Sequence, residues 1–183
     1  SRNYALGLRH RVGGRHVFGL SAFENRIDDL IQFVTLSFDP FVGRNLNVER
    51  ARIRGLEASW EYAGDDWRAR AEAIRQDPED RSDGSRLLRR AEESYTLAVA
   101  RRVGPAELGA DLLLAGERED FGFPAPVRLG GYFLANLSAS VVLGERWTVQ
   151  ARLENALDRD YQLADGYNTM RRALMVATRY DFR

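Results

Sequence analysis

Few residues in this chain of 183 residues are suited to covalent chemistry. The chain contains no Cys, which excludes thiolate nucleophiles, disulfides and thiolate metal sites. Its two His, His10 and His16, flank a Gly13-Gly14 turn without further metal ligands beside them, and we expect both to be solvated or to face a polar interior. A hydrolytic site needs a nucleophile or an activated water near a His or paired carboxylates. No Gly-x-Ser-x-Gly motif occurs, and the sequence predicts that the protein is not an enzyme.

The charged residues limit the classes of ligand. The 27 Lys and Arg balance the 27 Asp and Glu, which argues against a nucleic-acid partner because such a partner needs a basic face. An acidic segment from Asp77 to Asp83 offers carboxylates for Ca²⁺, but it lacks the spacing of an EF-hand loop and is typical of a solvated tip. We therefore expect neither a metal site nor a cofactor.

The dominant pattern in the chain is the alternation of β-strands. From Trp147 to Glu154, apolar residues take every odd position and polar residues every even one, so that a strand there has one apolar and one polar face. No run reaches the about 18 apolar residues of a membrane-spanning helix, whereas a membrane-spanning strand needs only about 9–11 residues with every second one apolar. The periodicity predicts no helix and about nine strands. Their ranges are 3–12, 16–26, 46–62, 66–76, 88–102, 107–117, 130–143, 147–155 and 172–182.

The connections between these strands alternate in length. An up-and-down barrel places all its short turns at one rim and all its long loops at the other, as outer-membrane barrels do with periplasmic turns and extracellular loops. The sequence therefore predicts an all-β, antiparallel, up-and-down transmembrane β-barrel segment. The short turns are expected at 13–15, 63–66, 104–106 and 144–146, and the long polar loops at 27–45, 77–87, 118–129 and 156–171.

The three Trp lie beside the short turns. Trp60 and Trp67 flank the 63–66 turn, and Trp147 follows the 144–146 turn. This placement is typical of an aromatic girdle at the lipid headgroups. The alternative is that aromatic rings pack against hairpin ends, as they do in any sheet.

Three Arg stand toward the other end of the third strand. Arg50, Arg52 and Arg54 share the parity of Leu56, so the apolar face becomes basic as the strand leaves the expected hydrocarbon layer. An Arg costs about 2–4 kcal/mol at the bilayer midplane but little near the interface. These side chains could contact lipid phosphates or be solvated.

Three motifs follow one another along the chain: Arg54-Gly-Leu-Glu-Ala58, Leu153-Glu-Asn-Ala-Leu-Asp-Arg-Asp-Tyr161 and Asp165-Gly-Tyr-Asn-Thr169. The last precedes a terminal strand that closes on aromatic residues. In order and spacing they resemble the C-terminal half of TonB-dependent outer-membrane receptors, and within that family the likeness is greatest to vitamin B12 (cobalamin) receptors. The resemblance covers essentially the whole chain. The residues that match the motifs are Gly55, Glu57, Asn155, Tyr161, Gly166, Tyr167, Arg172 and Phe182.

The resemblance implies that residues 1–183 are the C-terminal part, about nine strands, of a receptor barrel of about 22 strands. Such a receptor imports a bulky nutrient of the cobalamin or iron-siderophore class across the Gram-negative outer membrane, with energy from the TonB–ExbB–ExbD system. The plug domain, TonB box and signal peptide are expected upstream of Ser1, so these residues alone would not be competent for transport. The implied partners also include membrane lipid, lipopolysaccharide and the barrel-assembly machinery, which reads the C-terminal strand.

In this family the ligand is held by long extracellular loops and by the plug. Aromatic loop residues could stack on a flat small-molecule ligand or pin a loop to its neighbours. Asn155 and Tyr161 could likewise fix a turn through hydrogen bonds without meeting a ligand. By this resemblance the loop candidates for ligand binding are Asp28, Asp29, Phe38, Asp39, Phe41, Phe121, Phe123, Tyr161 and Tyr167.

Two features depart from the family pattern. The family usually ends on an aromatic residue, whereas here Arg183 follows Phe182, which puts efficient assembly in doubt. Thr169-Met170-Arg171 replaces the Pro-Gly-Arg that usually precedes the last strand, which affects the loop geometry. A passive porin or a small ligand-binding β-barrel is the alternative, and it would be favoured by a chain that folds alone in water.

Overall fold

The computed structural model describes residues 1–122 and 125–182, without the side chains of residues 29–30, 32–36, 38, 41 and 45–49. The described part of the chain is built from strands and contains no helix, and therefore no helix that could span a membrane. The strands are β1 (Arg2–Val12), β2 (His16–Phe38), β3 (Phe41–Ala63), β4 (Trp67–Asp80), β5 (Glu93–Val103), β6 (Ala106–Ala115), β7 (Arg118–Asp120), β8 (Val127–Leu129), β9 (Tyr132–Leu143), β10 (Trp147–Glu154) and β11 (Ala173–Tyr180).

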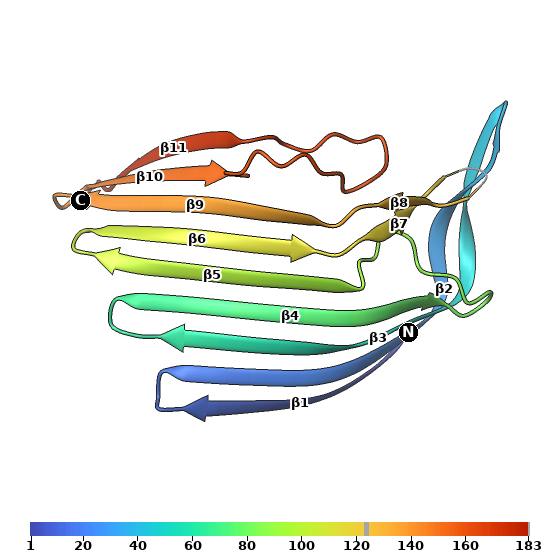
Figure 1. The fold of residues 1–183 in the computed structure, drawn as a ribbon, viewed down its shortest axis with the longest axis horizontal. Coiled ribbons are helices and arrows are strands. Elements are labelled where there is room, and N and C mark those ends of the chain that lie inside the picture. Colours follow the sequence, from blue (N-terminus) through green and yellow to red (C-terminus); the bar gives the residue numbers. More distant parts are fainter. Residues whose placement is uncertain (123–124, 183) are drawn as a thin grey trace.

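Nine of these strands form a single antiparallel sheet in the order β1-β2-β3-β4-β5-β6-β9-β10-β11. Neighbours in the sheet are neighbours along the chain, except that the small β7–β8 hairpin lies between β6 and β9 in sequence. Figure 1 shows the strands side by side, with every short turn at one end and the longer connections at the other. The prediction of nine up-and-down strands is confirmed.

The short turns rely on glycine where the backbone must reverse. Gly13 and Gly14 adopt φ angles of +58° and +71°, a left-handed conformation that residues with a Cβ atom rarely adopt. The turn closes the β1–β2 hairpin between Val12 and His16, which are paired in the register. This geometry fixes which residues of β1 and β2 share a face.

The prediction of a polar loop over residues 27–45 was wrong. β2 and β3 continue as a paired ribbon to a tight turn at Asp39-Pro40, and the pairing runs from His16↔Tyr62 to Phe38↔Phe41. Pairing with β1 ends at Arg26 and pairing with β4 ends at Ala51, so the ribbon extends past the neighbouring strands (Figure 1). Residues 30–38 are uncharged and rich in β-branched and aromatic types, a composition that favours strand over loop.

Smaller differences concern the other connections. The strand predicted to begin at residue 88 begins at Glu93, because Arg89 adopts a positive φ of 60° that interrupts an extended strand. The acidic segment predicted as a solvated tip starts within β4, which runs to Asp80. The predicted loop 118–129 contains the β7–β8 hairpin.

The two faces of the sheet differ in chemistry. One face presents large apolar side chains to the surroundings, among them Leu6 (79% exposed), Leu8 (71%) and Leu174 (67%). Only five hydrophobic residues of the described part are buried, so the sheet does not enclose an ordinary core. An apolar surface of this extent is stable against lipid and costly in water.

The opposite face is lined by ion pairs. Arg68 contacts Glu107 across the sheet at 2.5 Å, and Arg9 contacts Glu61 at 3.5 Å. Two hollows of about 560 and 550 Å³ lie between such polar side chains. This face therefore suits water or a polar protein surface, as the lumen of a barrel does.

Aromatic rings gather on the apolar face near the short turns, as predicted. Trp147 packs on Tyr180 with ring centroids 4.8 Å apart, and Trp60 and Tyr62 stack near His16. His16 does not face the polar interior, one of the two alternatives predicted for it, but is half-buried on the apolar face. Its Nδ1 accepts a hydrogen bond from Trp60 Nε1 at 3.2 Å within this aromatic cluster.

The Arg of β3 lie toward the opposite end of the strand. Arg52 forms an ion pair with Glu79, and Arg54 forms one with Asp77 at 2.9 Å. Both carboxylates belong to β4, so these guanidinium groups are at least partly neutralised within the sheet.

Gly55 offers a test of the contact between β3 and β4. A Cβ at this position would lie 2.5 Å from the Arg75 carbonyl oxygen, 2.8 Å from the Phe23 ring and 3.0 Å from the Gln76 Cα. Because backbone atoms cannot move aside cheaply, we expect Gly55→Ala to lower the free energy of unfolding by about 1–3 kcal/mol. Urea unfolding of the whole gene product in detergent micelles measures this. Gly130→Ala, whose Cβ meets nothing within 4 Å, is the control, and equal losses in both variants would contradict the prediction.

Candidate functional site

Three connections meet at the end of the sheet opposite the short turns. They comprise residues 81–92 between β4 and β5, residues 116–122 and 125–131 with the β7–β8 hairpin, and residues 155–172 between β10 and β11 (Figure 1). Hydrogen bonds and ion pairs join all three, although they are far apart in sequence. This junction is the candidate functional site.

Asp120 lies at the centre of the junction and is fully buried. Its carboxylate accepts hydrogen bonds from Arg89 Nε at 2.6 Å and from the backbone N–H groups of Phe121 at 2.8 Å and Asp165 at 2.6 Å. Burial alone would raise the pKa of this carboxyl, but the Arg89 guanidinium and the two N–H donors together hold the pKa below its ordinary value. Asp120 is therefore ionised at neutral pH.

Arg118 is the second buried charge, at 5% exposure. Its guanidinium donates hydrogen bonds to the backbone carbonyls of Gln162 and, at 3.4 Å, Leu163. It also lies 5.3 Å from the centroid of the Tyr132 ring, a cation–π distance, and Tyr132 packs on Tyr161 with centroids 4.6 Å apart.

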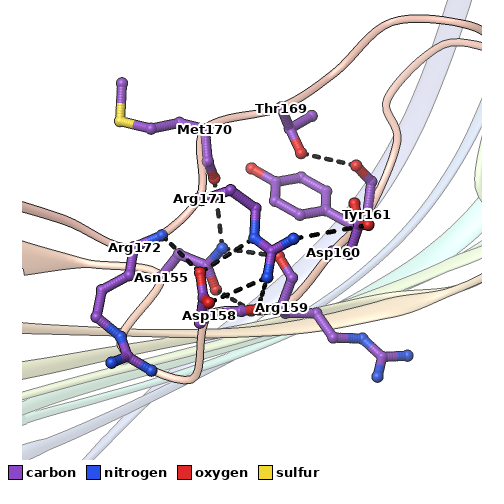
Figure 2. A network of polar contacts seen from close by, with 9 residues as sticks. All are labelled: Asn155, Asp158, Arg159, Asp160, Tyr161, Thr169, Met170, Arg171 and Arg172. Carbon is purple, nitrogen blue, oxygen red and sulfur yellow. Dashed lines mark hydrogen bonds and ion pairs between the residues drawn. The ribbon is translucent and has the colours of Figure 1, made fainter.

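Asn155 organises the start of the β10–β11 connection (Figure 2). It is 4% exposed and adopts φ +46°, a conformation that Asn tolerates better than most residues. Its side-chain amide donates to the carbonyl of Arg159 at 2.8 Å and of Met170 at 3.3 Å, while its carbonyl oxygen accepts from the Arg159 N–H at 2.8 Å. The side chain thus joins both ends of this connection.

A second bridge joins the same two ends. Arg171 donates two hydrogen bonds to the Asp158 carboxylate, at 3.1 and 3.0 Å, and the Arg172 N–H donates a third at 3.0 Å (Figure 2). The Arg171 guanidinium and the Arg172 N–H lower the pKa of Asp158 from 3.8 to about 2. The pKa of Arg171 is raised by the same partner.

The predicted ligand-binding residues that the structure describes lie in different surroundings. Asp28 is exposed on β2 and Asp39 is exposed at the tip of the β2–β3 ribbon, so the first predicted ligand loop is a strand pair. Phe121 lies beneath Arg89, 5.2 Å from its guanidinium. Tyr161 packs on Tyr132, whereas Tyr167 is 70% exposed. The side chains of Asp29, Phe38, Phe41 and Phe123 lie outside the described residues.

Most of the motif residues serve contacts or turns within the protein itself. Gly55 permits the close approach of β4, and Glu57 accepts a hydrogen bond from Ser21 at 3.3 Å on the polar face. Gly166 has φ +73°, as a turn requires, and Phe182 packs on Tyr180 with centroids 4.7 Å apart.

The sequence reasoning missed the junction itself, including Arg89, Arg118 and Asp120. Arg118 and Asp120 stand in a segment predicted as a polar loop, whereas Arg89 stands in a segment predicted as a strand, and no short-range spacing links the three. Within the described part of the chain, no group of His, Asp or Glu is arranged to hold a metal ion.

Comparison with known proteins assigns the chain to a family. A family profile described as "TonB dependent receptor-like, beta-barrel" matches residues 1–156. The chain belongs to the TonB-dependent receptor β-barrel family. These receptors are transporters of the Gram-negative outer membrane and not enzymes, as predicted from the sequence.

Relatives of this receptor barrel include two vitamin B12 transporters. BtuB of Vibrio vulnificus strain YJ016 is 28% identical over 168 residues, which is 90% of this chain and 26% of that protein. BtuB of Vibrio cholerae serotype O1 is 25% identical over 171 residues, 90% of this chain and 27% of that protein. The chain thus spans about a quarter of the length of these relatives.

Solved structures share the fold of the receptor barrel. The copper transporter OprC superposes with a TM-score of 0.80 at 17% identity, over 98% of this chain and 32% of that one. The pyoverdine receptor FpvA of Pseudomonas aeruginosa PAO1 superposes with a TM-score of 0.77 at 17% identity, over 98% and 29%. The nine strands therefore match part of such a barrel.

The Asn155 network predicts a specific loss of stability. We expect Asn155→Ala to destabilise the receptor by about 2 kcal/mol or more, because three hydrogen bonds of a buried side chain are lost at about 1 kcal/mol each. Asn155→Gly should lose the same bonds while easing the positive φ, and should be the less destabilised of the two. Urea unfolding of the whole receptor in micelles compares them. A loss below about 0.5 kcal/mol in both would contradict this role.

The Asp158–Arg171 bridge predicts a loop that loosens in acid. Because the pKa of Asp158 is lower in the folded loop than in an unfolded chain, the bridge stabilises the loop fully above about pH 4 and loses this effect as the pH falls toward 2. Residues 1–183 contain no Cys, so a spin label at Asn168→Cys, with any Cys in the remainder of the protein replaced by Ser, can report loop mobility specifically. We expect mobility to rise between pH 4 and pH 2. In Asp158→Asn the mobility should already be high at pH 7, and an unchanged acid response in that variant would contradict the assignment.

Proposed function

We propose that this chain is the C-terminal part of the barrel of an outer-membrane importer that takes up a bulky nutrient of the cobalamin or iron-siderophore class. The observation that favours this function is a sheet with an apolar outer face, a polar inner face and its ordered long connections gathered at one end. The likeness to proteins named as vitamin B12 transporters and as a pyoverdine receptor supports the nutrient class.

The two edges of the sheet support the view that the chain works within a larger barrel. β1 and β11 each have one neighbour within the sheet. An unpaired strand edge is not tolerated in hydrocarbon, because its N–H and C=O groups find no water there. We infer that further strands close the barrel, and that a plug domain, TonB box and signal peptide belong to the remainder of the protein.

The proposed partners follow from the same arrangement. Membrane lipid and lipopolysaccharide would surround the apolar face, with the aromatic cluster at the periplasmic headgroups. The TonB–ExbB–ExbD system would act through the N-terminal remainder, and the barrel-assembly machinery would read β11 and Phe182. The ligand itself would meet the extracellular end.

At that end the described candidates for ligand binding have two different roles. Phe121 and Tyr161 contact residues of the junction, which favours the pinning of loops. Tyr167 is 70% exposed, and its ring is available to stack on a flat ligand. Asp28 and Asp39, on the β2–β3 ribbon, are exposed polar candidates.

Uptake in cells tests the proposed function. The whole gene product should be expressed in a Gram-negative host that lacks its own cobalamin and siderophore receptors, and uptake of labelled cyanocobalamin and of ferric siderophores should be measured. We expect saturable uptake of one of these ligands, and we expect it to be lost in the same host without TonB. Uptake that is independent of TonB and does not saturate would contradict this function and favour a passive porin.

A further inference from the structure

The short strand β7 places two charges in the interior of the loop end. Arg118 and Asp120 are two residues apart, so both side chains project from the same side of the strand, and both are buried. Burial of a charge is strongly unfavourable unless it is paired and hydrogen-bonded. Their partners therefore indicate what the burial stabilises, and those partners come largely from other connections.

Asp120 joins its own connection to two others. The Arg89 guanidinium at 2.6 Å belongs to the 81–92 connection, and the Asp165 N–H at 2.6 Å belongs to the 155–172 connection. The Arg89 N–H also donates to the Glu119 carbonyl at 2.7 Å, so backbone and side chain of Arg89 hold the same neighbour. One carboxylate thus couples three segments.

Arg118 reinforces only one of these couplings. Its hydrogen bonds reach the carbonyls of Gln162 and Leu163, which lie in the 155–172 connection next to Asp165. Its position beside Tyr132 adds the Tyr132–Tyr161 ring contact to the same connection. The described contacts of Arg118 do not reach the 81–92 connection.

We propose that Arg118 and Asp120 form a clamp that makes the 81–92 connection, the described part of the 116–131 connection and the 155–172 connection move as one rigid body, and that positions the 155–172 connection at the mouth of the barrel. Ligand entry then displaces the three connections together or not at all. The coupling follows from the contacts alone, whereas its value for ligand binding rests on the proposed function.

Each variant of the clamp removes a different set of hydrogen bonds between the connections. Arg89→Gln removes the side-chain link to 81–92, and it leaves the backbone N–H of residue 89 bonded to Glu119 and the Asp165 N–H bonded to Asp120. Arg118→Gln removes the Arg118 bonds to Gln162 and Leu163 in the 155–172 connection, and it leaves both Arg89 and the Asp165 N–H bonded to Asp120. Asp120→Leu removes the two links made by the Asp120 carboxylate, to Arg89 and to the Asp165 N–H, and it leaves the bonds of Arg118 and the Arg89 N–H bond to Glu119. Asp120→Asn retains one amide oxygen as an acceptor. Arg89→Lys keeps the positive charge and should restore the native pattern in part.

Hydrogen–deuterium exchange of the whole gene product in micelles, without ligand, tests the proposal. In Asp120→Leu we expect peptides of 81–92 and of 155–172 to exchange about tenfold faster or more, as the loss of about one hydrogen bond implies. In Arg89→Gln only 81–92 should accelerate, and in Arg118→Gln only 155–172. Asp160→Asn is the matched control. The Asp160 carboxylate is 84% exposed, and its ion pair with Arg171, at 3.8 Å, involves neither Arg118 nor Asp120.

Several results would overturn the clamp. They are acceleration of a single connection in Asp120→Leu, acceleration of both or neither in Arg89→Gln, and equal acceleration in β5, β9 and β10, which would indicate global loosening. If Asp120→Leu does not fold, the two Arg variants still decide the question, because each is expected to loosen a different connection. Since no ligand is used, failure of the clamp is distinguishable from failure of the import function.

Discussion

The satisfaction of backbone hydrogen bonds in the absence of water governs this structure. In hydrocarbon, every N–H and C=O group must find a partner within the protein, and an antiparallel ladder between consecutive strands provides one. The nine-stranded sheet meets this demand along its length, and its side chains then divide between lipid on one face and a polar interior on the other. The small number of buried hydrophobic residues is a consequence of this division rather than a sign of instability.

The two ends of the sheet solve different problems. At the short-turn end the chain only has to reverse, and Gly13 and Gly14 with a cluster of aromatic rings are sufficient. At the other end long connections return to water, where each could adopt many conformations. Buried charges restrict that freedom there, since Asp120 and Arg118 are stable in their positions only while groups from the neighbouring connections surround them.

The motifs that identify the family are mainly geometric in this chain. Gly55 permits β4 to approach, and Asn155 closes the β10–β11 connection at a positive φ. Neither position needs a ligand to explain its residue. This separates family membership, which such motifs reveal, from ligand choice, which depends on exposed side chains such as Tyr167 and on how the connections are held.

The sequence by itself determined the strand periodicity, the alternation of short and long connections, the family and the placement of Trp60, Trp67 and Trp147 near the short turns. These features are local or repetitive, because a side chain's face follows from its parity along a strand. The extension of β2 and β3 to Asp39-Pro40 was missed, because a mixed apolar stretch such as residues 30–38 shows no clean alternation. Only the tertiary structure revealed the junction of Arg89, Arg118, Asp120 and Asp165, because its partners come from three connections and meet only after the sheet has set their ends side by side.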